Sequence, residues 1–306
     1  MKPTFLSEED KITELREQSL YYRKKSRGKL GYAYVVFRQN ILSAVGLVLV
    51  VTMLILAILG PYITPFDPNA TNSAIKMQPP SFSHLFGTDT YGRDVFSRVL
   101  AAAQVDFLIA FASIGFSFIV GSILGSLAGY LGSLVDTGIM RVMDIIQSFP
   151  PFILGMALAA AIGPGIRNLV IVITVIMVPG FARMIRSRVV SLRERSFIDA
   201  AKCTGVPTWK IVLFYLIPNS IGPMVVNAAL NMSYAMLDAA GLSFIGLGVR
   251  APQAEWGMMI SQGVDNMIAG QWWTSLFPGL ALFLSVLGFN ILADGLRDLF
   301  DPRRKR

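Results

Sequence analysis

Long apolar runs alternate along this chain with short polar stretches that contain proline and glycine. Six of the runs are close to the twenty or so residues that a helix needs to cross a hydrocarbon core. We expect spans near residues 41–60, 107–131, 136–162, 168–184, 221–241 and 272–293. The pattern therefore predicts an all-α integral membrane protein, with one domain of six transmembrane helices over residues 41–295.

Prolines and glycines are expected to shape these spans. Pro61 should end the first span, the pair Pro150–Pro151 should bend the third, and Pro179–Gly180 should weaken the inner end of the fourth. Three glycines of the second span recur at four-residue spacing and share one helix face, where another helix can approach closely: Gly121, Gly125 and Gly129.

A mostly polar stretch, SFIDAAKCTGVPTWKIVLFYLIPN, lies between the fourth and fifth spans at residues 196–219. Residues 197–202 are expected to be helical, since Ala200 and Ala201 are strong helix formers. Gly205 permits the left-handed residue that ends many helices, and Pro207 should start a second helix that runs to Pro218. Five arginines precede the stretch, so residues 184–219 should form a cytoplasmic loop: Arg183, Arg186, Arg188, Arg193 and Arg195.

Residues 62–105 are polar and balanced in charge, which is typical of the outer face of a membrane protein. Within them Thr88 or Asp89 can cap a helix start, and Gly87 and Gly92 permit tight turns. We expect a stiff outer element that leads into the second span and also offers a surface to a partner.

Several polar residues lie within or beside the spans. Asn227, Asn231 and Asp238 follow i, i+4, i+11 spacing and share one side of the fifth helix. That side can line a watery path whose carboxylate attracts a cationic amino terminus, or Asp238 can cap or anchor the segment 241–248; both alternatives stay open. In the third span Arg141 could pair with Asp136 or, at the better i+3 spacing, with Asp144.

Composition supports the membrane assignment. Of 306 residues, 54% are hydrophobic and 15% charged, against roughly 25% charged in soluble domains. The net charge of +8 lies mainly beside the apolar runs, which indicates topology signals and not nucleic-acid binding. Residues 1–40, acidic and then basic with interleaved tyrosines, and the basic tail 296–306 are both expected in the cytoplasm.

The chain lacks the residues of most catalytic chemistry. Cys203 and His84 are its one cysteine and one histidine, which leaves no thiolate metal site and no histidine-based hydrolase. The sequence also contains no phosphate-binding loop of the G-x4-G-K-[ST] type. We therefore expect no catalytic residue, no metal and no cofactor. The alternatives are a self-sufficient secondary transporter or channel, for which Asp238 is the main titratable candidate, and an intramembrane hydrolase with a Ser–Lys pair.

Four motifs resemble the permease subunits of ABC importers, and within them the family of oligopeptide and dipeptide permeases. The stretch with Asp199, Ala200, Ala201, Gly205 and Pro218 resembles the EAA loop, with aspartate in place of the usual glutamate. The others are GTDTYGRDVFSR, DAAGLSFIGLGVRAPQAEWG and FNILADGLRDLFDPR, in the order of the family. One departure is AAQVDF at residues 102–107, where the family has GAR-x-SL.

The resemblance implies a type I ABC-importer permease, of the C type, in the cytoplasmic membrane of a bacterium or archaeon. It implies a pore shared with a homologous second permease, two ATPase subunits that hold ATP and Mg²⁺, and an extracytoplasmic solute-binding protein. The implied cargo is an oligopeptide or dipeptide, with nickel chelates or another small solute as the alternative. The loop that would couple to the ATPase contains Asp199, Ala200, Ala201, Gly205, Val206, Pro207 and Pro218. The candidate contacts of the binding protein are Gly87, Thr88, Asp89, Gly92, Arg93 and Asp94.

Overall fold

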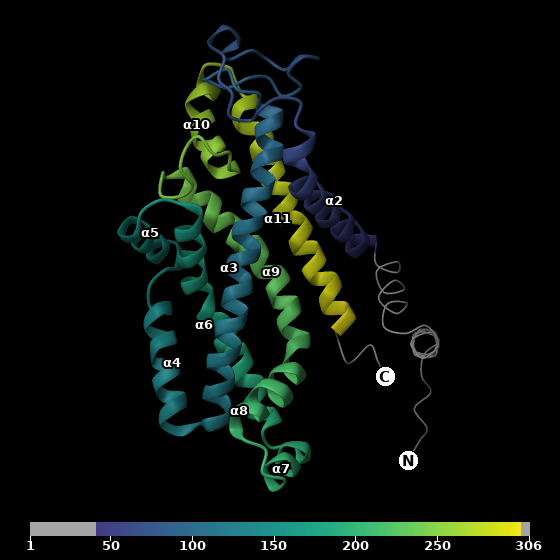
Figure 1. Cartoon of the computed structure of the whole chain (residues 1–306), viewed down its shortest axis with the longest axis vertical. Coiled ribbons are helices and arrows are strands. Elements are labelled where there is room, and N and C mark those ends of the chain that lie inside the picture. The colour runs from purple at the N-terminus through teal and green to yellow at the C-terminus, as the bar shows by residue number, and fades with distance from the viewer. Residues whose placement is uncertain (1–40, 301–306) are drawn as a thin grey trace, which may run out of the picture.

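The computed structural model describes residues 41–300, and its named elements are all helical (Figure 1). They are α2 (Ile41–Ile63), η1 (Ser73–Ile75), α3 (Val95–Leu131), α4 (Ser133–Gln147), α5 (Pro151–Ile162), α6 (Ile166–Leu192), α7 (Ser196–Cys203), α8 (Thr208–Lys210), η2 (Ile211–Leu216), α9 (Ile217–Phe244), α10 (Trp256–Ile268) and α11 (Trp273–Phe300). The predicted all-α class is confirmed. The predictions for residues 1–40 and for residues 301–306 of the predicted tail 296–306 lie outside the described residues, while residues 296–300 belong to α11.

Five helices are long and apolar enough to cross a membrane: α2, α3, α6, the continuous helix Thr208–Phe244, and α11. The pair α4 and α5 meets the same criterion if it counts as one span, although the two helices meet at 88°. Over residues 41–300 the structure thus holds five spans, or six with the bent pair, in agreement with the six predicted.

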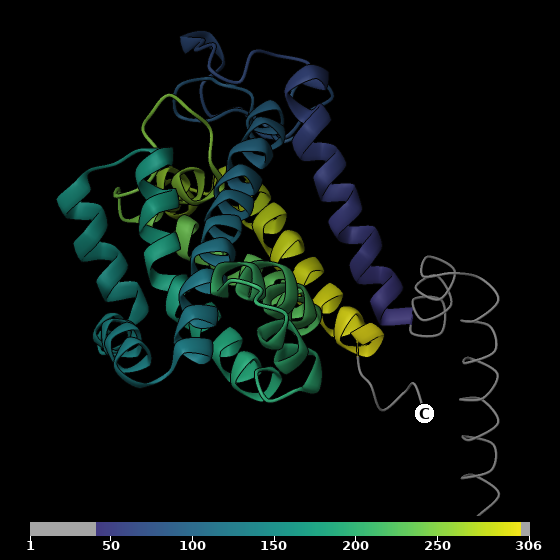
Figure 2. The same ribbon diagram turned by 60° about the horizontal axis from the view of Figure 1, so that its bottom comes forward.

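The long helix α3 runs through the middle of the bundle, with α2 on one flank and the α4–α5 pair on the other (Figures 1 and 2). The predicted glycine face of α3 packs directly on α6, which confirms its role in close packing. A Cβ atom built on Gly125 would lie 2.2 Å from the carbonyl oxygen of Ala182, so only glycine permits this approach.

Three helix ends predicted at or near prolines are wrong, because these helices continue through the prolines. Pro61 lies inside the last turn of α2, and α6 continues through Pro179 to Leu192. Pro218 ends nothing, because α8, η2 and α9 form one continuous helix. Its π-helical stretch η2 ends at Leu216, two residues before Pro218, and such a widened turn rearranges the backbone hydrogen bonds locally. Packed membrane helices tolerate proline where neighbours and local distortions satisfy the released backbone groups.

The third predicted span is broken and not merely bent. Residues Ser148–Pro150 separate α4 from α5, and Pro150 has the extended conformation that proline imposes on a preceding residue. Pro151 then occupies the first turn of α5, where its missing N–H is not needed. The two halves consequently point in different directions (Figure 1).

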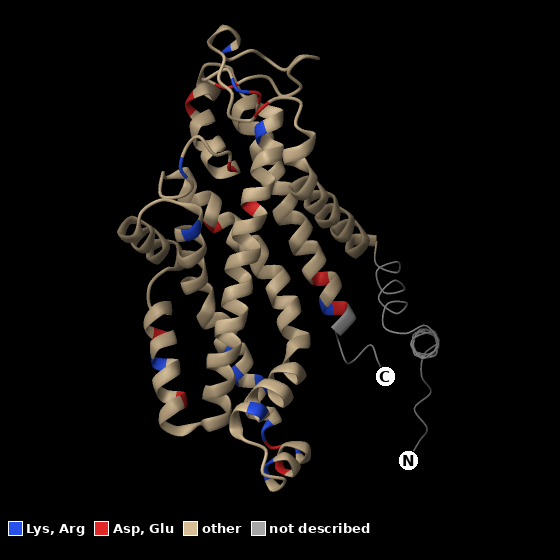
Figure 3. Ribbon diagram, in the orientation of Figure 1, with Lys and Arg blue, Asp and Glu red and all other residues tan. Residues whose placement is uncertain are grey.

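Two ends of the bundle differ from each other. We call residues 64–94 together with α10 the cap end, and the opposite tip, formed by α7, the α7 end (Figure 1). At the cap end α3 begins at Val95, twelve residues before the start of the predicted second span, and α10 was not predicted at all. Within the described chain, lysines and arginines gather around α7 and the adjoining end of α6 (Figure 3).

Candidate coupling loop, translocation face and cap

The short helix α7 ends in a Schellman motif, as Gly205 predicts. The N–H of Gly205 donates to the carbonyl of Lys202 (3.0 Å), and the N–H of Val206 donates to the carbonyl of Ala201 (3.0 Å). Gly205 has φ of +74°, so the backbone reverses within one residue. Pro207 then precedes the first turn of the long helix Thr208–Phe244. Local sequence therefore suffices to build this turn.

α7 projects from the bundle with most of its surface uncovered (Figure 1). Ile198 and Ala201, three residues apart, are its buried side chains. Asp199 is exposed, and its ion-pair partner among residues 41–300 is Lys202 on the same helix, at 3.1 Å. The loop predicted at 184–219 is mostly helical, because α6 extends to Leu192 and the next helix starts at Thr208. The tip is thus joined to a long helix on each side.

Arginines of α6 hold α4 against the bundle. Arg183 pairs with Asp144 at 2.6 Å, and Arg186 makes a two-pronged contact with Asp136, with Nη2 to Oδ2 at 2.6 Å. The predicted pairing of Arg141 within α4 is therefore wrong, because both aspartates face arginines of the neighbouring helix. Spacing within one helix could not reveal partners 39 and 50 residues away.

A polar face runs along α9. Asn227, Asn231 and Asp238 are all partly buried and share one side of the helix, as their spacing predicts. Tyr234 belongs to the same side, seven residues after Asn227, and is 52% exposed. Tyr234 was not among the residues predicted for this face, although its spacing would have identified it.

Asp238 does not cap residues 241–248, whereas its alternative role as an anchor of that segment stays a prediction. Helix α9 continues six residues beyond Asp238, to Phe244. Backbone groups close it instead: the N–H of Gly246 donates to Ser243 and the N–H of Leu247 donates to Leu242. The carboxylate of Asp238 takes no part in this cap.

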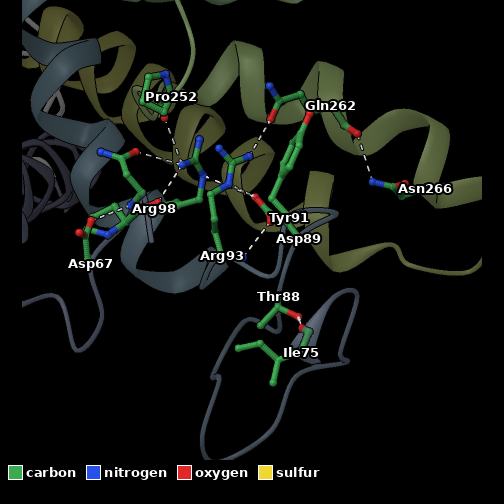
Figure 4. Close-up of polar contacts among 12 residues, drawn as sticks. Asp67, Ile75, Thr88, Asp89, Tyr91, Arg93, Arg98, Pro252, Gln262 and Asn266 are labelled. Carbon is green, nitrogen blue, oxygen red and sulfur yellow. Dashed lines mark hydrogen bonds and ion pairs between the residues drawn. The ribbon is translucent and has the colours of Figure 1, made fainter. Parts of the chain in front are cut away.

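The cap end is held by a dense network around the turn 87–94 (Figure 4). The carboxylate of Asp89 accepts hydrogen bonds from the backbone N–H groups of Tyr91 (2.8 Å) and Arg93 (3.0 Å) and pairs with Nε of Arg93 (2.6 Å). The helix cap of α3 is Asp94, and not Thr88 or Asp89 as predicted. Its carboxylate accepts from the N–H of Ser97 at 2.8 Å.

Burial indicates what these residues do at the cap end. Thr88 is 0% exposed, and Arg93 and Asp94 are each 4% exposed. The neighbouring Tyr91, in contrast, is 52% exposed. Direct contact of Gly87, Thr88, Asp89, Gly92, Arg93 and Asp94 with a binding protein stays a prediction. Their burial favours a role in shaping the surface on which Tyr91 stands.

The carboxylates of Glu255 and Asp106 lie close together beneath the cap end. Neither was among the predicted site residues. Glu255 caps α10, and its two oxygens accept from the N–H groups of Gly257 (2.9 Å) and Met258 (2.7 Å). Asp106 of α3 accepts from the N–H of Trp256 at 3.1 Å. Burial raises the pKa of Glu255 above its usual value, and Asp106 lies beside it. The departure AAQVDF contains Asp106, so a carboxyl directly before the predicted second span was the available signal.

Over residues 41–300 no group of three or more His, Cys, Asp or Glu side chains is arranged to hold a metal ion. The geometry offers an exposed helical tip, a polar helix face and a rigid cap.

Comparison with known proteins adds an evolutionary relationship to this geometry. Residues 121–306 match the profile of the binding-protein-dependent transport system inner membrane components. Residues 30–80 match the N-terminal transmembrane domain of oligopeptide transport permease C. The chain is 41% identical to the dipeptide transport system permease protein DppC of Alkalihalophilus pseudofirmus, over 89% of this chain and 90% of that protein. It is 39% identical to the probable D,D-dipeptide transport system permease protein DdpC of Escherichia coli, over 94% of this chain and 97% of that protein.

A solved structure shares the fold. The MetNI methionine ABC transporter, in an inward-facing conformation, contains a chain that aligns with a TM-score of 0.51 and 19% identity. The alignment covers 66% of this chain and 96% of the other. At this identity the likeness shows the fold alone.

Proposed function

Because the chain belongs to the family of binding-protein-dependent transport system inner membrane components, as a permease of the dipeptide and oligopeptide group, we propose that it forms half of the translocation pore of an ATP-driven peptide importer. A homologous second permease supplies the other half. The chain itself is a non-catalytic membrane subunit, so ATP and Mg²⁺ belong to two partner ATPase subunits. A solute-binding protein delivers the cargo.

The observation that carries the coupling proposal is the exposed tip at α7. An eight-residue helix with two buried side chains offers Asp199, Ala200 and Gly205 to a partner. Helix α6 precedes α7 and the helix Thr208–Phe244 follows it. A displacement of α7 by a partner would therefore be transmitted to the bundle through these two long helices. We assign the ATPase contact to this tip, where Val206 and Pro207 form the turn, and Pro218 lies farther along the helix that follows.

Charge supports the orientation. The lysines and arginines gathered at the α7 end support a cytoplasmic location for that end, by the positive-inside rule (Figure 3). The cap end then faces outward, where a binding protein approaches. The multi-pass chain would lie in the cytoplasmic membrane of a bacterium or archaeon.

Two substitutions at the tip test the coupling. Gly205→Leu places a bulky side chain at φ of +74°, and Asp199→Lys reverses an exposed charge. We expect both variants to reach the membrane, since neither residue is in a span, but to lose peptide uptake and ATPase association. Gly270→Leu is the matched control, because Gly270 has φ of +85° and open space around it at the cap end. If both tip variants, at parental expression, import at the parental rate, α7 is not the transmission element.

For the cargo, we propose that the polar face of α9 lines the peptide path. Its carboxylate, Asp238, would attract a cationic amino terminus, and Asn227, Asn231 and Tyr234 would offer hydrogen bonds. Asp238→Asn keeps shape and hydrogen-bonding capacity while it removes the charge. Uptake of peptides with free amino termini should fall more than uptake of acetylated peptides. Equal effects on both would exclude this electrostatic role, and uptake of nickel chelates or another small solute in place of peptides would support the alternative cargo.

A further inference from the structure

Two buried carboxyl groups meet where α10 packs against α3. Asp106 of α3 is 1% exposed, and Glu255, the residue before α10, is 0% exposed. The two side chains lie within hydrogen-bonding reach of each other. An ionised carboxylate only accepts hydrogen bonds, so two ionised groups would face each other without a bond. A single proton between them would replace this repulsion with a hydrogen bond.

The two groups differ in how well a negative charge on them is stabilised. Both oxygens of Glu255 accept backbone N–H groups, from Gly257 (2.9 Å) and Met258 (2.7 Å), at a helix start where the dipole also favours negative charge. Asp106 accepts the N–H of Trp256 on Oδ2, at 3.1 Å. Its Oδ1 is buried and has no hydrogen-bond partner among residues 41–300. Glu255 is therefore the better place for the charge, and Oδ1 of Asp106 for the proton.

The surroundings of the pair supply no counter-charge. In the described part of the chain, neither carboxyl group forms an ion pair with a lysine, arginine or histidine. Helix α2 contains no charged residue, and Arg98 of α3 lies eight residues before Asp106 and pairs with Asp89. Other charged residues of the surrounding elements are Asp238 of α9 and the exposed Arg167, Arg250 and Asp265. Two ionised carboxylates here would be buried like charges, which is unfavourable.

Burial also acts on the titration of the pair. It raises the pKa of Glu255, although the N–H groups of its helix cap act in the opposite sense. Two interacting carboxyl groups in one buried site therefore keep a proton to a higher pH than separate groups in water. With that proton, Oδ1 of Asp106 changes from an unbonded acceptor into a donor to Glu255.

The helix that begins after Glu255 fixes one end of α9. A Cβ atom built on Gly257 would lie 2.3 Å from the carbonyl oxygen of Ala240, so α10 and α9 approach closely. The hydroxyl of Ser261 donates to the carbonyl of Phe244 at 2.7 Å. Asp238 lies on α9 two residues before Ala240. The position of α10 therefore determines where the cap end of α9 lies.

We propose that Asp106 and Glu255 share one proton at neutral pH, held on Oδ1 of Asp106, and that this hydrogen bond fastens α10 to α3. The two acids are positioning residues for the cap end of α9. Loss of the proton would leave two buried negative charges and would loosen α10 from α3. The tests measure protonation and stability and not uptake, so they do not depend on the transport function proposed above.

Asp106→Asn is the closest permanent substitute for the protonated acid. Its amide oxygen can accept from Trp256 and its NH2 group can donate to Glu255. Infrared difference spectra compare the full-length parent with each variant, in the complex and at neutral pH. Asp106→Asn should lose the carbonyl band of one protonated carboxyl group. Asp265→Asn is the matched control, because Asp265 is exposed on α10, and it should lose no such band.

The pH dependence of melting gives a second readout. The folded chain keeps a proton that the unfolded chain has lost, so the parent should lose stability as pH rises. Between about pH 5 and pH 7, its melting temperature should fall about 3 °C per pH unit more steeply than that of Asp106→Asn. At neutral pH the Asn variant should melt at or above the parent, and Asp265→Asn should follow the parent.

Asp106→Leu removes the hydrogen bond altogether. We expect it to melt below the parent at every pH and to speed hydrogen exchange at the amides of Gly257 and Met258, whereas Asn restores both to parental values. The infrared and pH comparisons need only the Asn variant, so they hold even where the Leu variant does not fold. The proposal is wrong if Asp106→Asn loses no protonated-carboxyl band, if it keeps the pH slope of the parent, or if it is as unstable as Asp106→Leu.

Discussion

Gly205 at the α7 end and Gly92 at the cap end have nearly the same backbone, with φ of +74° and +73°. Their surroundings differ completely. A Cβ on Gly205 would meet nothing within 4 Å, whereas one on Gly92 would lie 1.8 Å from the carbonyl oxygen of Asn72. Positive φ thus favours glycine at both positions, but the turn at Gly205 has free space around it and the turn at Gly92 does not.

The arginines repeat this contrast. The side chain of Arg186 near the α7 end is 38% exposed and binds one aspartate, while Arg93 at the cap end is 5% exposed and binds Asp89 and Gln262. Conspicuous motif residues at the α7 end remain on the surface, and those at the cap end are buried. A motif in the sequence can therefore mark either a contact surface or a scaffold, and burial distinguishes the two.

The largest expected effect comes from alanine at the two glycines. Gly92→Ala forces a methyl group into a backbone carbonyl, and we expect it to cost about 2–5 kcal/mol of folding stability. Gly205→Ala should cost only about 1–2 kcal/mol, because strain at positive φ is its one penalty. Thermal unfolding of the two variants in detergent measures the difference. Equal losses of stability for the two variants would contradict the difference in crowding between the two ends.

The next effect compares the arginines. Arg93→Gln leaves the buried Asp89 without its main cation and should cost about 3–5 kcal/mol. Arg186→Gln removes a half-exposed pair, which after screening by water is worth about 0.5 kcal/mol. The midpoints of urea unfolding for both variants test this ranking. A larger loss of stability for Arg186→Gln would show that the buried ion pair of the cap end does not contribute more to stability than the half-exposed pair.

The smallest effect concerns pH at the base of the cap. Since burial raises the pKa of Glu255 above 4.5, the folded chain keeps a proton that the unfolded chain has lost. Stability should therefore fall as pH rises above 4.5, through the window up to the raised pKa. Glu255→Gln removes this contribution and retains an acceptor for the helix cap, so its melting temperature should fall less over the same window. An unchanged pH profile would show that Glu255 does not titrate there.

Local signals predicted much of this molecule. The apolar runs located the spans, the glycine spacing of α3 identified its contact with α6, and Gly205 with Pro207 specified the turn after α7. These features depend on neighbouring residues or on helix periodicity alone. The broken third span was only partly foreseen, because the sequence of Pro150–Pro151 indicates a break but not its angle of 88°.

Features that depend on distant residues were missed. Asp136 and Asp144 pair with arginines of another helix, and the Asp106 carboxylate meets the backbone of Trp256, 150 residues away. Burial of Arg93 follows from its packing against Gln262 of α10, which was not predicted as an element. One sequence without such contacts in view cannot separate a buried turn from an exposed one.

The central claim is that the exposed α7 tip is the surface that meets the ATPase. Cys203, the single cysteine of the chain, ends α7 and is exposed, so it can be labelled without any mutation. A thiol-reactive photo-crosslinker on Cys203 should join this chain to an ATPase subunit, with a yield that changes when ATP is added. A crosslink to the solute-binding protein instead, or labelling of Cys203 in intact cells by a reagent that cannot cross the membrane, would contradict the account.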